Sequence, residues 1–174
     1  MKLEDIYSYN PKNGEIRFKI DRHARKVKGM IAGWVKTDNK RQTSYREMRV
    51  DGKTVKAHRL AWRLFYGFWP VGIIDHINGD GLDNRIENLR DVDKFDSAKN
   101  KPIQRNNTSG VVGVNFHKPS GKWVAKISSM GKRITIGYFE TIDEAAKARR
   151  GKEIELSYHS NHGRKQSKLK STEK

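Results

Sequence analysis

The sequence contains no cysteine, only four prolines and no long apolar run. Without cysteine, the chain has no disulfide partner, no thiol nucleophile and no zinc site that depends on Cys ligands. Apolar stretches such as residues 71–74 are far shorter than the ~20 residues of a transmembrane helix. Residues 1–5 lack the apolar core of a signal peptide. We therefore expect a protein that neither crosses a membrane nor is secreted.

Acidic side chains are scarce relative to basic ones. The chain has 37 Lys and Arg residues against 20 Asp and Glu residues, a formal net charge of +17. Residues 1–60 carry +9, residues 61–105 carry 0 and residues 106–174 carry +8. Such a charge favours binding to a polyanion. The Asp-rich neutral centre would place carboxylates that can hold a cation between two surfaces that can hold phosphates.

The hydropathy pattern predicts a β-rich region over residues 1–57, and its excess of basic side chains leads us to expect that this region contacts DNA. Residues 14–20 alternate apolar and polar side chains, as in a half-buried strand, and residues 29–35 form a second candidate strand. The dipeptide Asp51-Gly52 lies between two short apolar segments and predicts a tight hairpin turn.

A compact core is expected over residues 58–100. In residues 59–66 the apolar side chains pair at i, i+4, which predicts a buried helix that ends at Gly67. A short strand through Ile73 and Ile74, a polar loop and a further short helix are expected to follow.

The remainder of the chain predicts a linker, a second module and a tail. Residues 101–110 are polar and rich in turn formers, which indicates a linker. Three strands separated by turns are expected in the module at residues 111–160, over 111–116, 122–128 and 133–139. Thr141 and Glu144 form a capping box for a following helix. The Lys- and Ser-rich tail, residues 161–174, is expected to be disordered.

The stretch that points to chemistry begins with Asp75-His76 at the expected strand end. A carboxylate is a ligand for Mg²⁺, and an imidazole can take a proton from an attacking water. Together they suit metal-assisted hydrolysis of a phosphodiester. The alternative is a solvated turn. The downstream Asp80, Asp83 and Asn84 are either turn formers or ligands of a weak Ca²⁺ loop, although they lack EF-hand spacing.

Three segments together, residues 57–62, 74–80 and 83–90, resemble HNH endonucleases of the phage and intron homing type. The resemblance covers about residues 5–105. It implies a ββα-metal fold that holds one divalent ion, Mg²⁺ or Mn²⁺. It also implies that Asp75 is a metal ligand, that His76 is the general base and that Asn88 orients the base. His58 opens the predicted helix, and we interpret it as a residue that supports the site.

One position departs from the family pattern. The third motif residue of the family, His or Asn, lies nine residues after the middle Asn, and here that position is Ser97. A neutral hydroxyl is a weak metal ligand, so the metal would depend more on Asp75, waters and DNA phosphate. Asn100 lies three residues further, on the same face of the expected helix, and Asp96 is adjacent; either is a candidate substitute.

Residues 108–160 resemble an AP2 DNA-binding domain, through a Gly-Lys-Trp element at 121–123 and a Gly-Tyr-Phe element at 137–139. The resemblance implies a three-stranded sheet that enters the major groove. By position, the exposed contacts would be Asn115, His117, Lys126, Ser128, Arg133 and Thr135. Trp123 is expected in the core with Phe139. The alternative is a generic basic sheet that holds only the DNA backbone.

These observations predict an α+β protein, a ββα-metal HNH nuclease domain followed by a small AP2-like three-stranded antiparallel sheet packed on one helix. The predicted function is site-biased, metal-dependent hydrolysis of double-stranded DNA, by a monomer or a DNA-assembled dimer in the cytoplasm of a bacterial or phage-infected cell. The alternative is a sequence-specific DNA-binding regulator with a weakened HNH scaffold. RNA binding is less favoured, because no aromatic stacking motif accompanies the basic strands.

Overall fold

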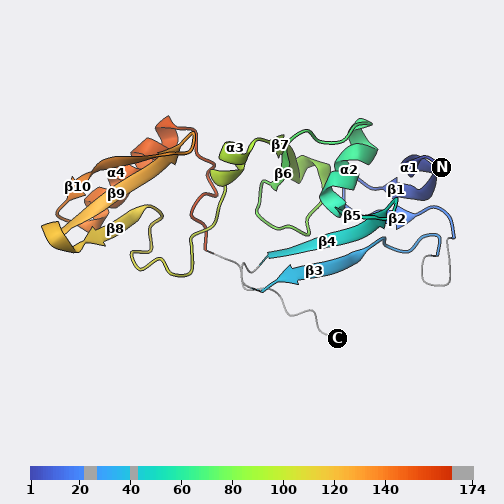
Figure 1. The fold of residues 1–174 in the computed structure, drawn as a ribbon, viewed down its shortest axis with the longest axis horizontal. Helices are drawn as coiled ribbons and strands as arrows, with labels where there is room; N and C mark the ends of the chain where they lie inside the picture. The colour runs from blue at the N-terminus through green and yellow to red at the C-terminus, as the bar shows by residue number, and fades with distance from the viewer. Residues whose placement is uncertain (22–26, 40–42, 166–174) are drawn as a thin grey trace. The chain divides into compact units, whose positions relative to one another are not determined.

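A computed structural model describes residues 1–21, 27–39 and 43–165. These residues form two compact units, residues 1–93 and the residues from 94 onward (Figure 1). Each is a mixture of short helices and small antiparallel sheets. Within the described ranges, no helix has the length and apolar character needed to cross a membrane. Residues 166–174 of the predicted tail lie outside the described part of the chain.

The first unit begins with a helix and two small sheets. Helix α1 (Leu3–Ile6) precedes the antiparallel pair β1 (Tyr7–Tyr9) and β2 (Ile16–Phe18). Strands β3 (Trp34–Asp38), β4 (Thr43–Val50) and β5 (Lys53–Lys56) form a three-stranded antiparallel sheet. The predicted hairpin turn is confirmed, because Asp51 and Gly52 both have positive φ, 48° and 76°, as a type I′ turn requires.

The strand predicted over residues 29–35 is wrong in its bounds. Strand β3 begins at Trp34, and Gly29 and Gly33 before it both have φ of 86°. This left-handed conformation interrupts a strand. A Cβ atom on Gly33 would lie 2.2 Å from the carbonyl oxygen of Glu47, so the chain crosses closely over β4 at this point.

The core of the first unit holds the helix and hairpin that position the site. Helix α2 (Ala57–Tyr66) ends at Gly67 in the left-handed conformation, as predicted. Its Leu60 is fully buried, together with Ile16 and Met48 from the two sheets. Strands β6 (Ile73–His76) and β7 (Leu89–Val92) form an antiparallel pair, joined by a polar loop that ends in the 3₁₀ turn η1 (Ile86–Asn88).

The second unit contains the predicted three-stranded antiparallel sheet. After α3 (Lys94–Ala98) come β8 (Val114–His117), the 3₁₀ turn η2 (Lys118–Ser120), β9 (Lys122–Ser129) and β10 (Lys132–Phe139), with β9 in the centre. Helix α4 (Ile142–Glu155) packs on β9 and β10. Its capping box between Thr141 and Glu144 is present, and Trp123 and Phe139 pack against the core formed by Val114, Ala125 and Ala145.

The boundary between the two units follows Asp93 and not the predicted linker at residues 101–110. The reason is a set of hydrogen bonds that holds the start of that segment within the second unit. The amide of Ile103 donates to the carbonyl of Arg164 at 3.0 Å, and the amide of Gly163 donates to the carbonyl of Lys101 at 2.9 Å. A backbone pairing of this kind cannot be read from residue composition.

Candidate active site

The central feature of the first unit is the end of strand β6. Asp75 pairs with Arg90, and His76 pairs with Leu89, in the antiparallel register of β6 and β7. Because both residues lie within a strand, their side chains point to opposite faces. His76 is 5 % exposed and faces the interior, whereas the carboxylate of Asp75 lies on the other face beside Arg90. Strand β6 ends at His76, and the turn begins at Ile77.

His76 is enclosed by three side chains from separate elements. Its Nε2 lies 3.2 Å from Oδ1 of Asn84. Its ring centroid lies 5.0 Å from that of His58 on α2 and 6.0 Å from that of Tyr45 on β4. An amide oxygen can only accept a hydrogen bond, so this assigned contact requires the proton of neutral His76 on Nε2. The lone pair then lies on Nδ1, the atom that a general base would use.

Burial keeps both histidines neutral near pH 7. Burial lowers the pKa of His76, while the hydrogen bond that Nε2 donates to Asn84 and the charge of Asp75 act in the opposite direction. Burial also lowers the pKa of His58, to about 2, and the neighbouring His76 contributes in the same direction. A neutral imidazole is the form that accepts a proton. The close contact of His58 with His76 agrees with a supporting role for His58.

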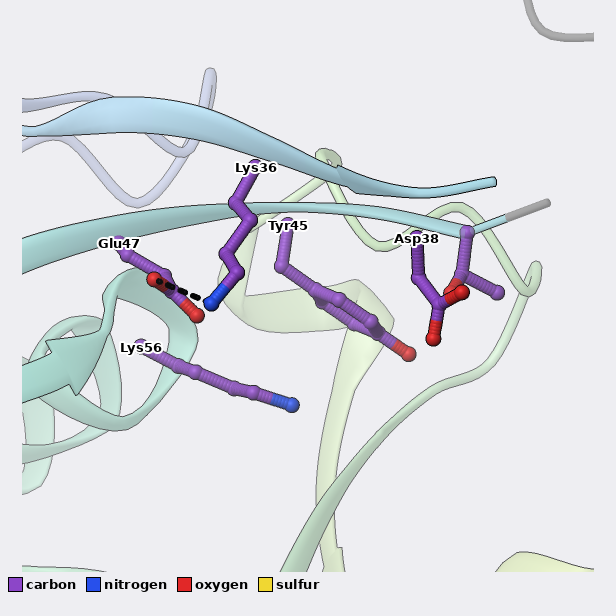
Figure 2. Close-up of a pocket in the computed structure, with 6 residues that line it drawn as sticks. Lys36, Asp38, Tyr45, Glu47 and Lys56 are labelled. Carbon is purple, nitrogen blue, oxygen red and sulfur yellow. Dashed lines mark ion pairs between the residues drawn. The ribbon is translucent and has the colours of Figure 1, made fainter. Parts of the chain in front are cut away.

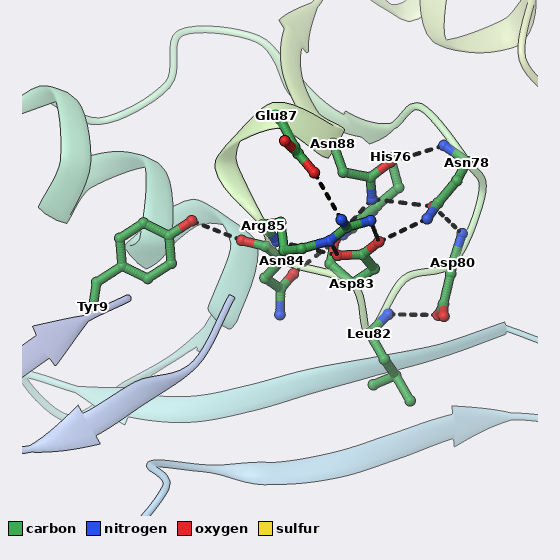
Figure 3. A network of polar contacts seen from close by, with 10 residues as sticks. All are labelled: Tyr9, His76, Asn78, Asp80, Leu82, Asp83, Asn84, Arg85, Glu87 and Asn88. Atoms are coloured by element: carbon green, nitrogen blue, oxygen red, sulfur yellow. Dashed lines mark hydrogen bonds and ion pairs between the residues drawn. The ribbon is translucent and has the colours of Figure 1, made fainter. Parts of the chain in front are cut away.

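The loop between β6 and β7 is fixed by a network of polar contacts (Figure 3). Oδ1 of Asn88 accepts from the amide of Asn78 at 2.9 Å, and its Nδ2 donates to the carbonyl of Asp83 at 2.8 Å. The hydroxyl of Tyr9 donates to the carbonyl of Asn84 at 2.7 Å. Asn88 therefore holds the loop, while the amide that contacts the His76 ring belongs to Asn84.

Sequence analysis missed this role of Asn84. It treated Asn84 as a turn former or a Ca²⁺ ligand, and the structure buries its side chain to 3 % exposure. The available signal was its position directly after Asp83, in a loop that must return from the strand end toward His76. Nothing in the spacing distinguishes it from Asn88, because loop geometry decides which amide reaches the ring.

The carboxylates of the loop make contacts typical of turn formers. Oδ1 of Asp80 accepts from the amide of Leu82 at 2.9 Å. Asp83 accepts from Nε and Nη2 of Arg85 at 2.9 and 2.8 Å. The hydrogen bond from the Arg85 side chain lowers the pKa of Asp83. These contacts favour the turn interpretation of the loop over a Ca²⁺ site.

Asp75 offers an oxygen ligand that suits a hard divalent cation. Within the described ranges, no three His, Asp or Glu side chains gather around a common point that could hold a metal. A cation at Asp75 would therefore keep waters and take further oxygens from DNA, which is the coordination that Mg²⁺ prefers. The donor set fits such an ion and does not fit a closed zinc site.

The three candidates for the third metal position, Ser97, Asn100 and Asp96, lie in the second unit. Ser97 is in α3, which ends at Ala98, so Asn100 lies beyond the helix and the predicted shared helical face is not formed. The backbone tightens there, with the amide of Asn100 donating to the carbonyl of Ser97. Asn100 is 3 % exposed, and its Oδ1 accepts from Arg164 at 3.0 Å.

The six predicted DNA contacts share one face of the second unit's sheet. Arg133 is paired with Ser128 and Thr135 with Lys126, while Asn115 and His117 alternate along β8. Tyr138 belongs to the same face, since it is paired with Val124 between these positions. It is 51 % exposed, and its ring lies 5.3 Å from that of His117. Tyr138 was not among the predicted contacts.

A cavity of about 260 Å³ lies on the sheet formed by β3, β4 and β5 (Figure 2). It is lined by Lys36, Asp38, Thr43, Tyr45, Glu47 and Lys56. Nζ of Lys36 lies 3.8 Å from Glu47, and Nζ of Lys56 lies 4.2 Å from the centre of the Tyr45 ring. Two cations face two carboxylates here, so the cavity does not by itself select a phosphate.

The first strand of the β6–β7 hairpin ends with an aspartate and a buried histidine that is held by an amide, and a short helix follows in the chain. This arrangement resembles that of a nuclease site. Comparison with known proteins agrees: residues 55–97 match the HNH endonuclease family. The chain is also 30 % identical over 82 residues to Protein 3.8 of Escherichia phage T7, an alignment that covers 47 % of this chain and 68 % of that protein. The chain belongs to the HNH endonuclease family.

The matched segment includes the β6–β7 hairpin of the first unit and the start of the second unit. It ends at residue 97, so the resemblance of residues 108–160 to AP2 domains remains a prediction. No solved structure matches the chain significantly. HNH nucleases act on DNA and generally use a divalent metal ion.

Proposed function

We propose that this chain is a site-biased, metal-dependent endonuclease of the homing type that nicks double-stranded DNA. The observation that carries the proposal is the arrangement at the end of β6. A buried His76 is held through Nε2 by Asn84, within the segment that matches the HNH family. The role of Asp75 is proposed from that family match, because its carboxylate lies on the other face of β6.

His76 acts in this proposal as the general base. Nδ1 takes a proton from a water, whose oxygen forms a bond to the scissile phosphorus while the bond to the 3′ oxygen breaks. The leaving 3′ oxygen takes a proton from a solvent water, so the products are a 5′ phosphate and a 3′ hydroxyl. Asn84 keeps the ring in the tautomer that presents Nδ1, and Asn88 holds the loop that carries Asn84. General-base catalysis of this type contributes about 10²- to 10⁴-fold to a rate.

Asp75 is the proposed ligand of one Mg²⁺ or Mn²⁺ ion. When bound, the ion would neutralise charge on the scissile phosphate and on the leaving 3′ oxygen. Ser97 occupies the third motif position, and Asn100 is the proposed substitute. A serine hydroxyl is a weaker ligand than an amide or imidazole, so cleavage is expected to depend strongly on metal concentration.

The second unit is proposed to bind the duplex as an AP2-like module. The support is its antiparallel sheet with α4 on one side and six polar or basic residues on one face. We assign the contacts to Asn115, His117, Lys126, Ser128, Arg133 and Thr135. One copy holds one cutting site, so a double-strand break would need a second copy assembled on the DNA or a second cut.

A supercoiled plasmid assay tests the proposal. With Mg²⁺ or Mn²⁺, the wild type should convert supercoiled DNA to the nicked circle, and His76→Ala should lose this activity while keeping its duplex affinity. Equal nicking by both proteins would contradict the role of His76. Tight binding without nicking by either protein would indicate the alternative, a DNA-binding regulator.

The departure at Ser97 is tested in the same assay. Ser97→Asn restores the residue type of the family pattern and should lower the metal concentration that gives half-maximal nicking. An unchanged metal dependence would show that this position does not limit cleavage. Inclusion of EDTA distinguishes metal-dependent nicking from a contaminating metal-independent activity.

A further inference from the structure

Asp75 forms an ion pair with Arg90 across the hairpin. Nε and Nη2 of Arg90 both donate to Oδ2 of Asp75, at 2.9 and 2.7 Å. The two residues are direct partners in the β6–β7 register, so both side chains lie on the same face of the hairpin. Asp75 keeps 14 % of its side chain exposed and Arg90 keeps 30 %. The pair is thus partly buried but accessible from solution.

This contact conflicts with metal binding at the same oxygen. A hard cation needs a carboxylate lone pair, and Oδ2 already accepts two charge-assisted hydrogen bonds. A divalent ion beside Asp75 would also face the positive charge of the guanidinium. An ion that binds Asp75 through Oδ2 therefore competes with Arg90.

We propose that Arg90 is a positioning residue that occupies the Asp75 carboxylate until the metal binds, and that its released guanidinium then binds a phosphate of the DNA beside the cleaved bond. This inference rests on the proposed function of Asp75 as metal ligand. The guanidinium fork fits a phosphate in the same bidentate way as a carboxylate. Because Arg90 is partly exposed, it can exchange one anion for the other without disturbing the buried core.

The exchange couples the two ligands. DNA phosphate draws Arg90 away from Asp75 and so strengthens metal binding, and the metal strengthens DNA binding by the same factor, because such coupling is reciprocal. A side chain with a merely structural role would not link the two affinities. Without DNA, Arg90 instead weakens metal binding and keeps the site inactive away from its substrate.

The test is a Mn²⁺ titration of the full chain, followed by electron paramagnetic resonance, with and without a short duplex. All proteins carry His76→Ala so that the duplex stays intact. Without DNA, Arg90→Gln should bind Mn²⁺ about tenfold more tightly, because it removes the positive charge that occupies the Asp75 carboxylate. The duplex should tighten Mn²⁺ binding severalfold when Arg90 is present and by much less in Arg90→Gln.

Two further variants separate the possible failures. Asp75→Asn should lose Mn²⁺ binding. Wild-type Mn²⁺ affinity in this variant would overturn both the proposed role of Asp75 as metal ligand and this inference. If Asp75→Asn loses binding while Arg90→Gln binds Mn²⁺ with unchanged or lower affinity, the inference alone is overturned. Arg90→Lys keeps the charge but loses the fork, so it should lie between the wild type and Arg90→Gln. It provides the same test if Arg90→Gln does not fold, and wild-type affinity and coupling in Arg90→Lys would then overturn the inference.

Discussion

Replacing Asn84 with alanine removes the side chain that holds His76. Both groups are buried, Asn84 to 3 % and His76 to 5 % exposure, so the substitution leaves the Nε2 proton of His76 without the amide oxygen that accepts it. An unsatisfied buried donor costs about 1–3 kcal/mol, and we expect a loss of this size in the free energy of unfolding. Loss of the ring's orientation should lower the cleavage rate about 10- to 100-fold.

The assay combines three measurements on Asn84→Ala: urea unfolding, duplex affinity and the single-turnover rate of nicking. Tyr9→Phe is the matched control, because its hydroxyl contacts the backbone of Asn84 and not the side chain that holds the ring. ¹⁵N NMR of the wild type should show the Nε2–H tautomer of His76. The Nδ1–H tautomer, or full activity in Asn84→Ala, would refute the reasoning.

Three further predictions concern pH, DNA binding and packing. Burial lowers the pKa of His58 below the unfolded value of about 6.5. The unfolded state therefore binds more protons, and stability falls as the pH drops below that value. At pH 5.5, His58 should lower the free energy of unfolding, measured with urea, by about 1.4 kcal/mol. His58→Gln should lose that part of the pH dependence, and an equal slope would contradict it. Lys126→Ala and Arg133→Ala should each weaken duplex binding and reduce its salt slope by about 0.9; unchanged slopes would show that this face does not bind DNA. Gly81→Ala would place Cβ 2.4 Å from a backbone oxygen of β4, and it should destabilise the first unit by about 2 kcal/mol. In the control Gly151→Ala the new Cβ meets no atom within 4 Å, so this variant should not destabilise the fold.

Local sequence signals predicted the elements whose formation depends on neighbouring residues. The turn at Asp51-Gly52, the end of α2 at Gly67 and the capping box at Thr141 were all confirmed. Each depends on backbone freedom or a short-range hydrogen bond, which residue type reveals directly. Residues 29–35 follow the same rule, because the positive φ of Gly29 and Gly33 interrupts the strand that was predicted there.

The site was predictable in composition but not in geometry. The Asp75-His76 pair was found from its residue types, yet its side chains lie on opposite faces because β6 continues through both residues. Long-range contacts decide which amide reaches His76 and which cation pairs with Asp75. Arg90 lies 15 residues from Asp75, and only the register of β6 with β7 brings them together.

Chemical rescue of the missing base tests the central claim most directly. In His76→Ala, the deleted ring leaves a space beside Asn84 that exogenous imidazole can enter. The account predicts a single-turnover nicking rate at least about 100-fold below that of the wild type, with unchanged duplex affinity and a rate that rises with imidazole concentration. A wild-type nicking rate in His76→Ala without imidazole would contradict the assignment of His76 as the general base.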